Sequence, residues 1–241
     1  GIAAAEAVAE KLALLLLKKN RVNMIFAAAP SQNEFLEALS KRTDLDWGRV
    51  NAFHMDEYVG LNRSAPQLFG NFLKKRLFDK LPFAGIYYLN GNADALQLEC
   101  QQYSDLLKLF PPDIVCLGIG ENTHLAFNDP PVADFNDEYK VKVVELDHAC
   151  RAQQVNDGCF AKLNEVPTHA ITLTIPALMS AESVFCIVPG KNKASAVELT
   201  LKENISETYP STILRRHAKS ILFLDKDSAA LLDKDVSFIK N

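Results

Sequence analysis

Short apolar runs rich in β-branched and aromatic residues alternate with segments of helical periodicity, and this alternation constrains the fold more than any other feature. Eight runs have the length and composition of buried strands. They begin at Val22, Arg49, Ile86, Asp113, Tyr139, His169, Ser183 and Ser220. Helical patterns lie between most of them, at 31–40, 66–79, 94–109 and 191–203. Because strands alternating with helices are typical of βαβ units, the sequence predicts an α/β fold with a mainly parallel sheet flanked by helices.

The organisation of the chain favours a single domain over residues 1–241. No internal repeat, low-complexity tract or long linker interrupts the alternation of strands and helices. The run "YKVKVVEL", which begins at Tyr139, alternates polar and apolar residues more strictly than the others. Strict alternation is typical of a strand with one solvated face, so we expect this run at a sheet edge or in a hairpin.

The most apolar segment is "AAAEAVAEKLALLLLKKN", near the start of the chain. Glu6, Glu10 and Lys11 interrupt it, which argues against a membrane span and against a signal peptide. Its helical spacing and the lysines at its end predict an amphipathic helix. Since the chain begins at Gly1 inside this helix, without a Met, we expect a further segment, such as a strand, to precede it.

The overall charge and the cysteines narrow the possible binding partners and the cellular compartment of the protein. A net charge of −4 and a pI near 5.8 argue against nucleic-acid binding, which requires clustered positive charge. Five scattered cysteines lack the paired spacing of a zinc site and are interpreted as reduced thiols in a cytoplasmic protein. The number of subunits is left open, and a homo-oligomer remains an alternative.

Polar residues follow four of the predicted strands, and carboxyl ends of parallel strands are where ligands bind in open α/β sheets. After the first strand, Ser31 and Glu34 fit a capping box, Ser-x-x-Glu. One interpretation is a capped helix only. The other is that the same first turn also binds an anion through its exposed N–H groups.

Two lysines, Lys191 and Lys193, stand where the helix predicted at 191–203 begins. Positive charge there opposes the helix dipole. The lysines are therefore either solvated on a surface turn, at a small cost, or share a bound phosphate or carboxylate with the helix end.

Asp56 and Glu57 are adjacent acids in the apolar segment "FHMDEYVGL". An apolar setting raises a carboxylate pKa and makes the group a usable general base. The alternatives are two solvated loop acids, or a metal site that also uses His54. The metal interpretation is weak, because no second cluster has characteristic ligand spacing.

The segment "GIGENTHLAFNDPP" places Asn122, His124 and Asp129 directly after the predicted strand at 113–120. A histidine with a carboxylate partner is held in one tautomer and can move protons near neutral pH. Further along, Arg151 could bind a phosphate or carboxylate with its guanidinium fork. His148 and Cys150 lie beside it, but nothing else supports a nucleophilic Cys–His pair.

Five segments occur in the order and approximate spacing found in one known family: "FHMDEYVGL", "LNGNA", "GIGENTHLAFNDP", "RAQQVNDGCF" and "PGKNKASAVE". On these segments the chain resembles the glucosamine-6-phosphate deaminase/isomerase family, which is related to the 6-phosphogluconolactonases. The resemblance covers nearly the whole chain. It implies a modified Rossmann-like sheet, a phosphorylated amino sugar as substrate, and no metal or organic cofactor.

The resemblance also implies roles for individual residues. The general base that moves a proton between C2 and C1 of the open-chain sugar corresponds to Asp56. The histidine that opens the pyranose ring corresponds to His124, and the acid that supports it to Asp129. The family's phosphate-binding turn, arginine and lysine correspond to Ser31, Arg151 and Lys193, and Lys191 is a further candidate for the phosphate.

The chain departs from the family pattern in three segments. Where the family reads Asp-Gly-His, this chain reads Asn122-Thr123-His124, and an amide cannot stabilise an imidazolium as a carboxylate does. Where the family has a glycine pair in the phosphate turn, this chain has Ala29-Pro30-Ser31, and proline has no N–H to donate. The segment "PPVADF" lacks the serines that bind an activator in regulated members, so we expect no such activation.

Three hypotheses follow. The leading one is an enzyme that converts glucosamine-6-phosphate or galactosamine-6-phosphate to the ketose phosphate, with release of ammonia. The second is a hydrolase of the 6-phosphogluconolactonase type, in which His124 activates water. The third is a sugar-phosphate-binding regulatory protein whose catalysis has lapsed, which Asn122 favours and the retained Asp56, His124 and Asp129 oppose.

Overall fold

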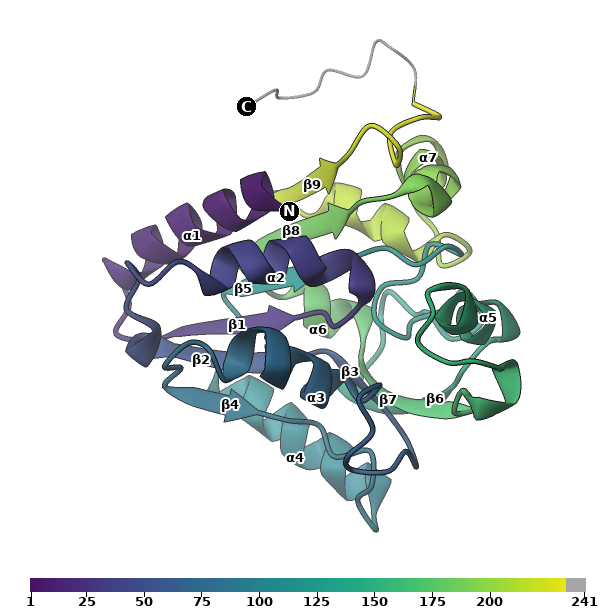
Figure 1. Ribbon diagram of the computed structural model, residues 1–241, viewed down its shortest axis with the longest axis horizontal. Helices are drawn as coiled ribbons and strands as arrows, with labels where there is room; N and C mark the ends of the chain where they lie inside the picture. Colours follow the sequence, from purple (N-terminus) through teal and green to yellow (C-terminus); the bar gives the residue numbers. More distant parts are fainter. Residues whose placement is uncertain (233–241) are drawn as a thin grey trace.

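A six-stranded parallel sheet forms the centre of the protein, as the computed structural model shows for residues 1–232, the part of the chain that it describes (Figure 1). Its strand order is β4-β2-β1-β5-β8-β9, and every neighbouring pair is parallel. The carboxyl ends of β1, β2, β5 and β8 therefore meet at one edge of the sheet. The mainly parallel α/β fold expected from the sequence is confirmed.

All of the strands except β3 lie where the periodicity placed them, to within about two residues for most ends. The strands are β1 (Val22–Phe26), β2 (Val50–His54), β3 (Asp56–Tyr58), β4 (Gly85–Tyr87), β5 (Ile114–Leu117), β6 (Val141–Glu145), β7 (His169–Leu173), β8 (Ser183–Val188) and β9 (Ser220–Leu224). The α-helices are α1 (Ile2–Leu16), α2 (Asn33–Ser40), α3 (Phe69–Leu73), α4 (Leu96–Leu109), α5 (His148–Asn156), α6 (Ile175–Met179) and α7 (Ala194–Lys202).

Side chains of the central strands alternate between two hydrophobic cores, one on each face of the sheet. In β1, Met24 and Phe26 belong to one core while Ile25 belongs to the other. The first core includes the apolar faces of α1, α2 and α3, and the second includes those of α4, α6 and α7. Both faces of the sheet are covered, as parallel sheets require, so its ligand-accessible groups lie at the strand ends.

A second sheet of three antiparallel strands, in the order β3-β7-β6, lies beside the carboxyl edge of the first (Figure 1). Its edge strand β6 is the run that begins at Tyr139 in the sequence, so the prediction of an edge strand is confirmed. Strand β3 was not predicted, because its three residues include two acids and resemble a loop. In the structure Asp56 pairs with Thr172 and Tyr58 with Ala170.

Two helix predictions need correction. The segment predicted as one helix over 66–79 is α3 followed by a π-helical turn, Lys74–Phe78. The capping box at Ser31 is wrong, because a 3-10 turn, Pro30–Gln32, precedes α2 and no side chain caps either element. Pro30 occupies the first position of that turn, where a missing N–H costs nothing. Among the described residues, no helix combines the length and apolar character needed to cross a membrane.

Candidate active site

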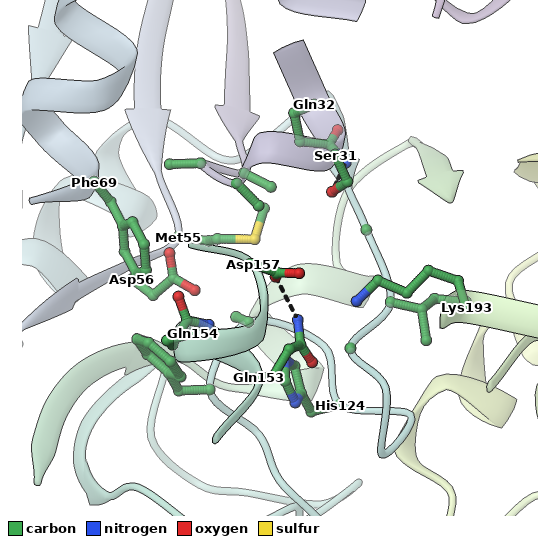
Figure 2. Close-up of a pocket in the computed structure, with 18 residues that line it drawn as sticks. Ser31, Gln32, Met55, Asp56, Phe69, His124, Gln153, Gln154, Asp157 and Lys193 are labelled. Carbon is green, nitrogen blue, oxygen red and sulfur yellow. Dashed lines mark hydrogen bonds between the residues drawn. The ribbon is translucent and has the colours of Figure 1, made fainter. Parts of the chain in front are cut away.

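One cavity at the carboxyl edge of the parallel sheet collects residues from several strand ends (Figure 2). The turn after β1 contributes Ser31, the segment after β2 contributes Asp56, the loop after β5 contributes His124, and the turn after β8 contributes Lys193. The other residues that line it are Ala27, Ala28, Ala29, Gln32, Met55, Phe69, Gly118, Ile119, Gly120, Ala126, Phe127, Gln153, Gln154 and Asp157. The sequence therefore identified residues that the fold brings together.

Asp56 reaches the cavity from β3, with only 8% of its surface exposed. Burial, and then the negative charge of Glu57, raise its pKa well above the usual value for an aspartate. A carboxylate with a raised pKa holds a proton more strongly once it has taken one. Asp56 thus has the position in the cavity and the raised pKa expected of a general base.

The Glu57 side chain points away from Asp56 and is buried in hydrogen bonds with the backbone. Its carboxylate accepts backbone N–H groups from Tyr58 at 2.9 Å, Phe69 at 3.0 Å and Gly70 at 2.9 Å. Burial raises its pKa to about 7, although these three donors oppose the shift. The alternative of two solvated loop acids is therefore wrong, and Glu57 ties β3 to the start of α3.

His124 forms a hydrogen-bonded cluster with Asn122 and Asp129. Its Nδ1 lies 2.6 Å from Asn122 Oδ1 and 2.9 Å from Asp129 Oδ1, and the amide of Asn122 donates to Asp129 Oδ1 at 2.9 Å. Both acceptors face Nδ1, so this nitrogen carries the proton and Nε2 is left as an acceptor. Burial opposes ionisation of Asp129, but the contacts with His124 and Asn122 outweigh it and lower its pKa. Asn122 thus supports the histidine jointly with Asp129.

The loop that carries His124 is strained and closely packed. Thr123 and Ala126 have positive φ angles of 70° and 52°, which non-glycine residues rarely adopt. Gly120 lies against the imidazole: a Cβ added there would be 2.1 Å from His124 Cε1. The far end of the loop is bonded to β7, because Phe127 N–H donates to Thr172 Oγ1 at 3.0 Å and Asn128 Nδ2 donates to Leu173 O at 2.8 Å.

Ser31 and Lys193 form the end of the cavity that is best suited to an anion. Lys193 is 7% exposed, and its amine points toward the middle of the cavity from the side opposite Asp56 (Figure 2). Burial lowers its pKa, while Asp157 and then Glu121 oppose this effect. The N–H groups of Gln32 and Asn33 are bonded to Ala29 O and Pro30 O within the turn. These two N–H groups are therefore not free to donate to an anion.

The end of α5 supplies residues that sequence reasoning missed. Gln153 accepts the N–H of Glu121 at 2.8 Å and donates to Asp157 at 3.2 Å, which joins this helix to the loop after β5. Asp157 lines the cavity in the same region as Lys193 (Figure 2). No local signal marks these residues, because glutamine is an ordinary helix residue and the helical pattern does not show which way a polar side chain faces.

Two predicted anion-binding residues are not part of this cavity. Arg151 directs its guanidinium to the carbonyls of Leu163 and Val166, both at 2.9 Å, where it fastens α5 to the following turn. Lys191 is exposed and does not line the cavity. The placement of Arg151 and Lys191 at the predicted pocket is therefore wrong. The periodicity of a helix predicts which face is apolar, but it does not predict which groups the polar side chains contact.

The metal interpretation of His54, Asp56 and Glu57 does not fit the geometry. His54 Nδ1 lies 2.8 Å from the backbone carbonyl of Asp56, and Nε2 accepts the N–H of Leu89 at 2.9 Å, so both ring nitrogens are used. Burial lowers the His54 pKa to about 4 and keeps the ring neutral. His54 shapes the corner between β2 and β3.

Within residues 1–232, ligand atoms of His124, Asp129 and Cys150 lie within 4.8 Å of one another. The imidazole nitrogen that faces Asp129 already forms the hydrogen bonds described above. Burial, reinforced by the charge of Asp129, raises the Cys150 pKa well above its usual value, which disfavours a thiolate ligand. These groups are better suited to holding a proton than to holding a metal.

A buried carboxylate, an oriented imidazole and a lysine at the strand ends of a parallel sheet define an α/β enzyme of acid–base chemistry. Comparison with known proteins gives the family. Residues 2–223 match the model of the glucosamine-6-phosphate isomerases/6-phosphogluconolactonase family. The chain belongs to this family. It is 36% identical over 197 residues to a glucosamine-6-phosphate deaminase of Bacillus cytotoxicus, which covers 82% of this chain and 73% of the relative.

Other comparisons agree with the family and the fold. A glucosamine-6-phosphate deaminase of Bacillus cereus is 37% identical over the same length. The solved structure of a monomeric glucosamine-6-phosphate deaminase superposes with a TM-score of 0.86 at 28% identity, covering 95% of this chain and 93% of that one. A 6-phosphogluconolactonase from Thermotoga maritima gives a TM-score of 0.74 at 20% identity, over 91% of this chain and 92% of that one. This last likeness shows the fold alone.

Proposed function

We propose that the protein is an amino-sugar-phosphate isomerase and deaminase, which converts glucosamine-6-phosphate or its galactosamine epimer to the ketose phosphate and ammonia. The observation that carries the proposal is the convergence of Asp56, His124 and Lys193 on one cavity. The named deaminases among the relatives support the same substrate class.

The first step is opening of the sugar ring. His124 Nε2 removes the proton of the anomeric hydroxyl while the bond between C1 and the ring oxygen breaks, and the imidazolium then passes that proton to the ring oxygen. The imidazolium formed in passing is stabilised by Asp129, whose lowered pKa keeps it ionised. Asn122 cannot share that charge, but its amide holds Asp129 in place and its carbonyl oxygen accepts from Nδ1.

The second step transfers a proton between carbons. Asp56 removes the proton from C2 of the open-chain aldehyde and returns it to C1 through an enolamine, while one N–H proton of the amino group passes to O1. The product is a ketose imine, and water hydrolyses its C2–N bond to release ammonia. General acid–base catalysis of this kind contributes about 10² to 10⁴-fold per transfer. Ser31 and Lys193 hold the phosphate so that C1 and C2 stay near the base.

Replacement of Asp56 tests this assignment. Asp56→Asn should reduce ammonia release from glucosamine-6-phosphate by about 10⁴-fold or more while leaving binding of the sugar phosphate nearly unchanged by calorimetry. Asp94→Asn, an exposed acid outside the cavity, is the matched control and should retain full activity. An active Asp56→Asn enzyme would exclude Asp56 as the base.

Solvent deuterium separates the proposed reaction from its alternatives. Isomerisation through an enolamine incorporates label at carbon, whereas lactone hydrolysis does not. Tight binding of both amino-sugar phosphates without turnover would instead support a regulatory protein. We also infer a cytoplasmic location, since the five cysteines are free thiols, and a single domain, since the family match spans most of the chain.

A further inference from the structure

A second, larger cavity adjoins the catalytic one and has the opposite electrostatic character. Its volume is about 640 Å³, against about 70 Å³ for the catalytic cavity. The two share a wall formed by Ala28, Ala29, Phe69, Gln154 and Asp157. Ligand pockets usually measure about 300 to 1,000 Å³, so the larger cavity has room for a sizeable group.

Three cationic side chains line the larger cavity: Arg63, Lys75 and Arg76. Against them stands one carboxylate, Asp157. None of the three cations forms an ion pair with another residue in the described part of the chain. The catalytic cavity, by contrast, has Asp56 and Asp157 beside the single cation Lys193.

Arg76 is the best-defined of these cations. Its guanidinium carbon lies 3.6 Å from the centre of the Phe72 ring, and its Nε is held by Asn33 Oδ1 at 2.5 Å. These contacts fix the plane of the guanidinium and leave its two terminal nitrogens without a protein acceptor in residues 1–232. Burial lowers the Arg76 pKa, as expected for a half-buried cation without a carboxylate partner. An anion would offset that cost.

The position of this cluster follows from the fold. Arg63 lies in the loop before α3, and Lys75 and Arg76 lie in the π-helical turn that continues α3. Glu57 ties the start of α3 to β3, the strand that carries Asp56. The cationic groups are therefore connected through α3 to β3, the strand that carries the proposed base, and they lie on the other side of Phe69.

We propose that the Arg63–Lys75–Arg76 cavity is an anion subsite, which binds a phosphate or carboxylate group next to the catalytic cavity. Two sources of that anion have the same chemistry. It is either an anionic group of a ligand that extends from the catalytic cavity past Phe69, or a separate small anion that binds beside the substrate. This inference goes beyond the proposed reaction and does not depend on it.

Calorimetric titration with inorganic pyrophosphate tests the subsite without any turnover. The wild-type protein should bind pyrophosphate, and Arg76→Gln should weaken binding by about tenfold or more, the effect of losing a charge-assisted contact. The double variant Arg63→Gln/Lys75→Gln should also weaken it. The matched control Lys18→Gln/Lys80→Gln removes two exposed charges outside the cavity and should change affinity by less than about twofold.

Three outcomes would overturn the subsite: no pyrophosphate binding, an equal loss in the Lys18/Lys80 control, or a loss in Lys193→Gln but not in Arg76→Gln. The last would place the anion in the catalytic cavity. If Arg76→Gln weakens binding as expected, kinetics distinguish the sources. Pyrophosphate that raises the KM for glucosamine-6-phosphate at constant kcat indicates one extended ligand, and pyrophosphate that changes kcat indicates a separate anion. Failure of the proposed reaction leaves the calorimetry unaffected.

Discussion

The contact between Gly120 and His124 gives the sharpest test of the site. A Cβ at position 120 would stand 2.1 Å from His124 Cε1, 2.2 Å from Nε2 and 2.4 Å from Nδ1. Carbon atoms in contact are normally about 3.5 Å apart, so the imidazole would have to recede by roughly 1.4 Å. That movement exceeds what the 2.6 Å and 2.9 Å hydrogen bonds at Nδ1 can absorb. The φ angle of Gly120 is not positive, so the effect is steric and not a matter of backbone freedom.

We expect Gly120→Ala to lower kcat by about 10² to 10⁴-fold, because a displacement of this size removes an oriented acid–base group. Overpacking should also cost about 1 to 3 kcal/mol of unfolding free energy. The assay is ammonia release from glucosamine-6-phosphate, together with urea unfolding. Gly48→Ala is the matched control, since its Cβ would meet one flexible side-chain oxygen, of Asp46, at 3.3 Å.

A double-mutant cycle with His124→Ala tests whether Gly120 acts through the imidazole. If Gly120 acts through the imidazole, Gly120→Ala should have almost no further effect on kcat in a His124→Ala background, and the lost stability should be largely recovered there. Additive effects on kcat, or a Gly120→Ala enzyme within about threefold of the wild-type rate, would show that the close contact does not position the histidine.

Two further predictions concern stability. Burial raises the Glu57 pKa from 4.5 to about 7, so the folded protein binds this proton more tightly than the unfolded chain does. As the pH rises through this interval, ionisation of Glu57 should therefore lower the free energy of unfolding by about 3 kcal/mol. Urea unfolding at pH 5 and pH 8 should show this loss, and Glu57→Gln should have a shallower pH dependence; an unchanged slope would contradict the assignment. Thr123→Gly should stabilise the protein by about 1 kcal/mol, because it relieves a positive φ and removes a buried hydroxyl that has no partner in residues 1–232. A lower urea midpoint for this variant would refute that expectation.

The sequence predicted the parts of the site that depend on strand ends. Ser31, Asp56, His124 and Lys193 each follow a run with strand composition, and parallel strands bring their carboxyl ends to one edge. To predict that these residues converge, only the correct fold class was needed. The partnership of His124 with Asp129 also followed from local spacing, because five residues of a tight loop cannot separate them widely.

The rest of the site depends on packing that no local pattern encodes. Glu57 is buried because the N–H groups of Phe69 and Gly70 happen to meet it from a distant segment. Arg151 lies within α5 and Asp157 is its C-cap residue, and only the docking of that helix decides which of them faces the cavity. The resemblance to the family favoured the arginine, and the structure places the aspartate there.

The proposed proton-transfer groups are connected to the three-stranded sheet, whereas Lys193, the proposed phosphate ligand, follows a strand of the six-stranded sheet. Asp56 is on β3, β3 pairs with β7, and β7 is bonded through Thr172 and Leu173 to the loop that carries His124. Lys193 instead follows β8 of the large sheet. On the proposed assignment, exchange of the turn that carries Lys193 for one of another shape would alter which ligands bind without disturbing the spacing between Asp56 and His124. In such a protein, the range of substrates can change while the catalytic groups keep their arrangement.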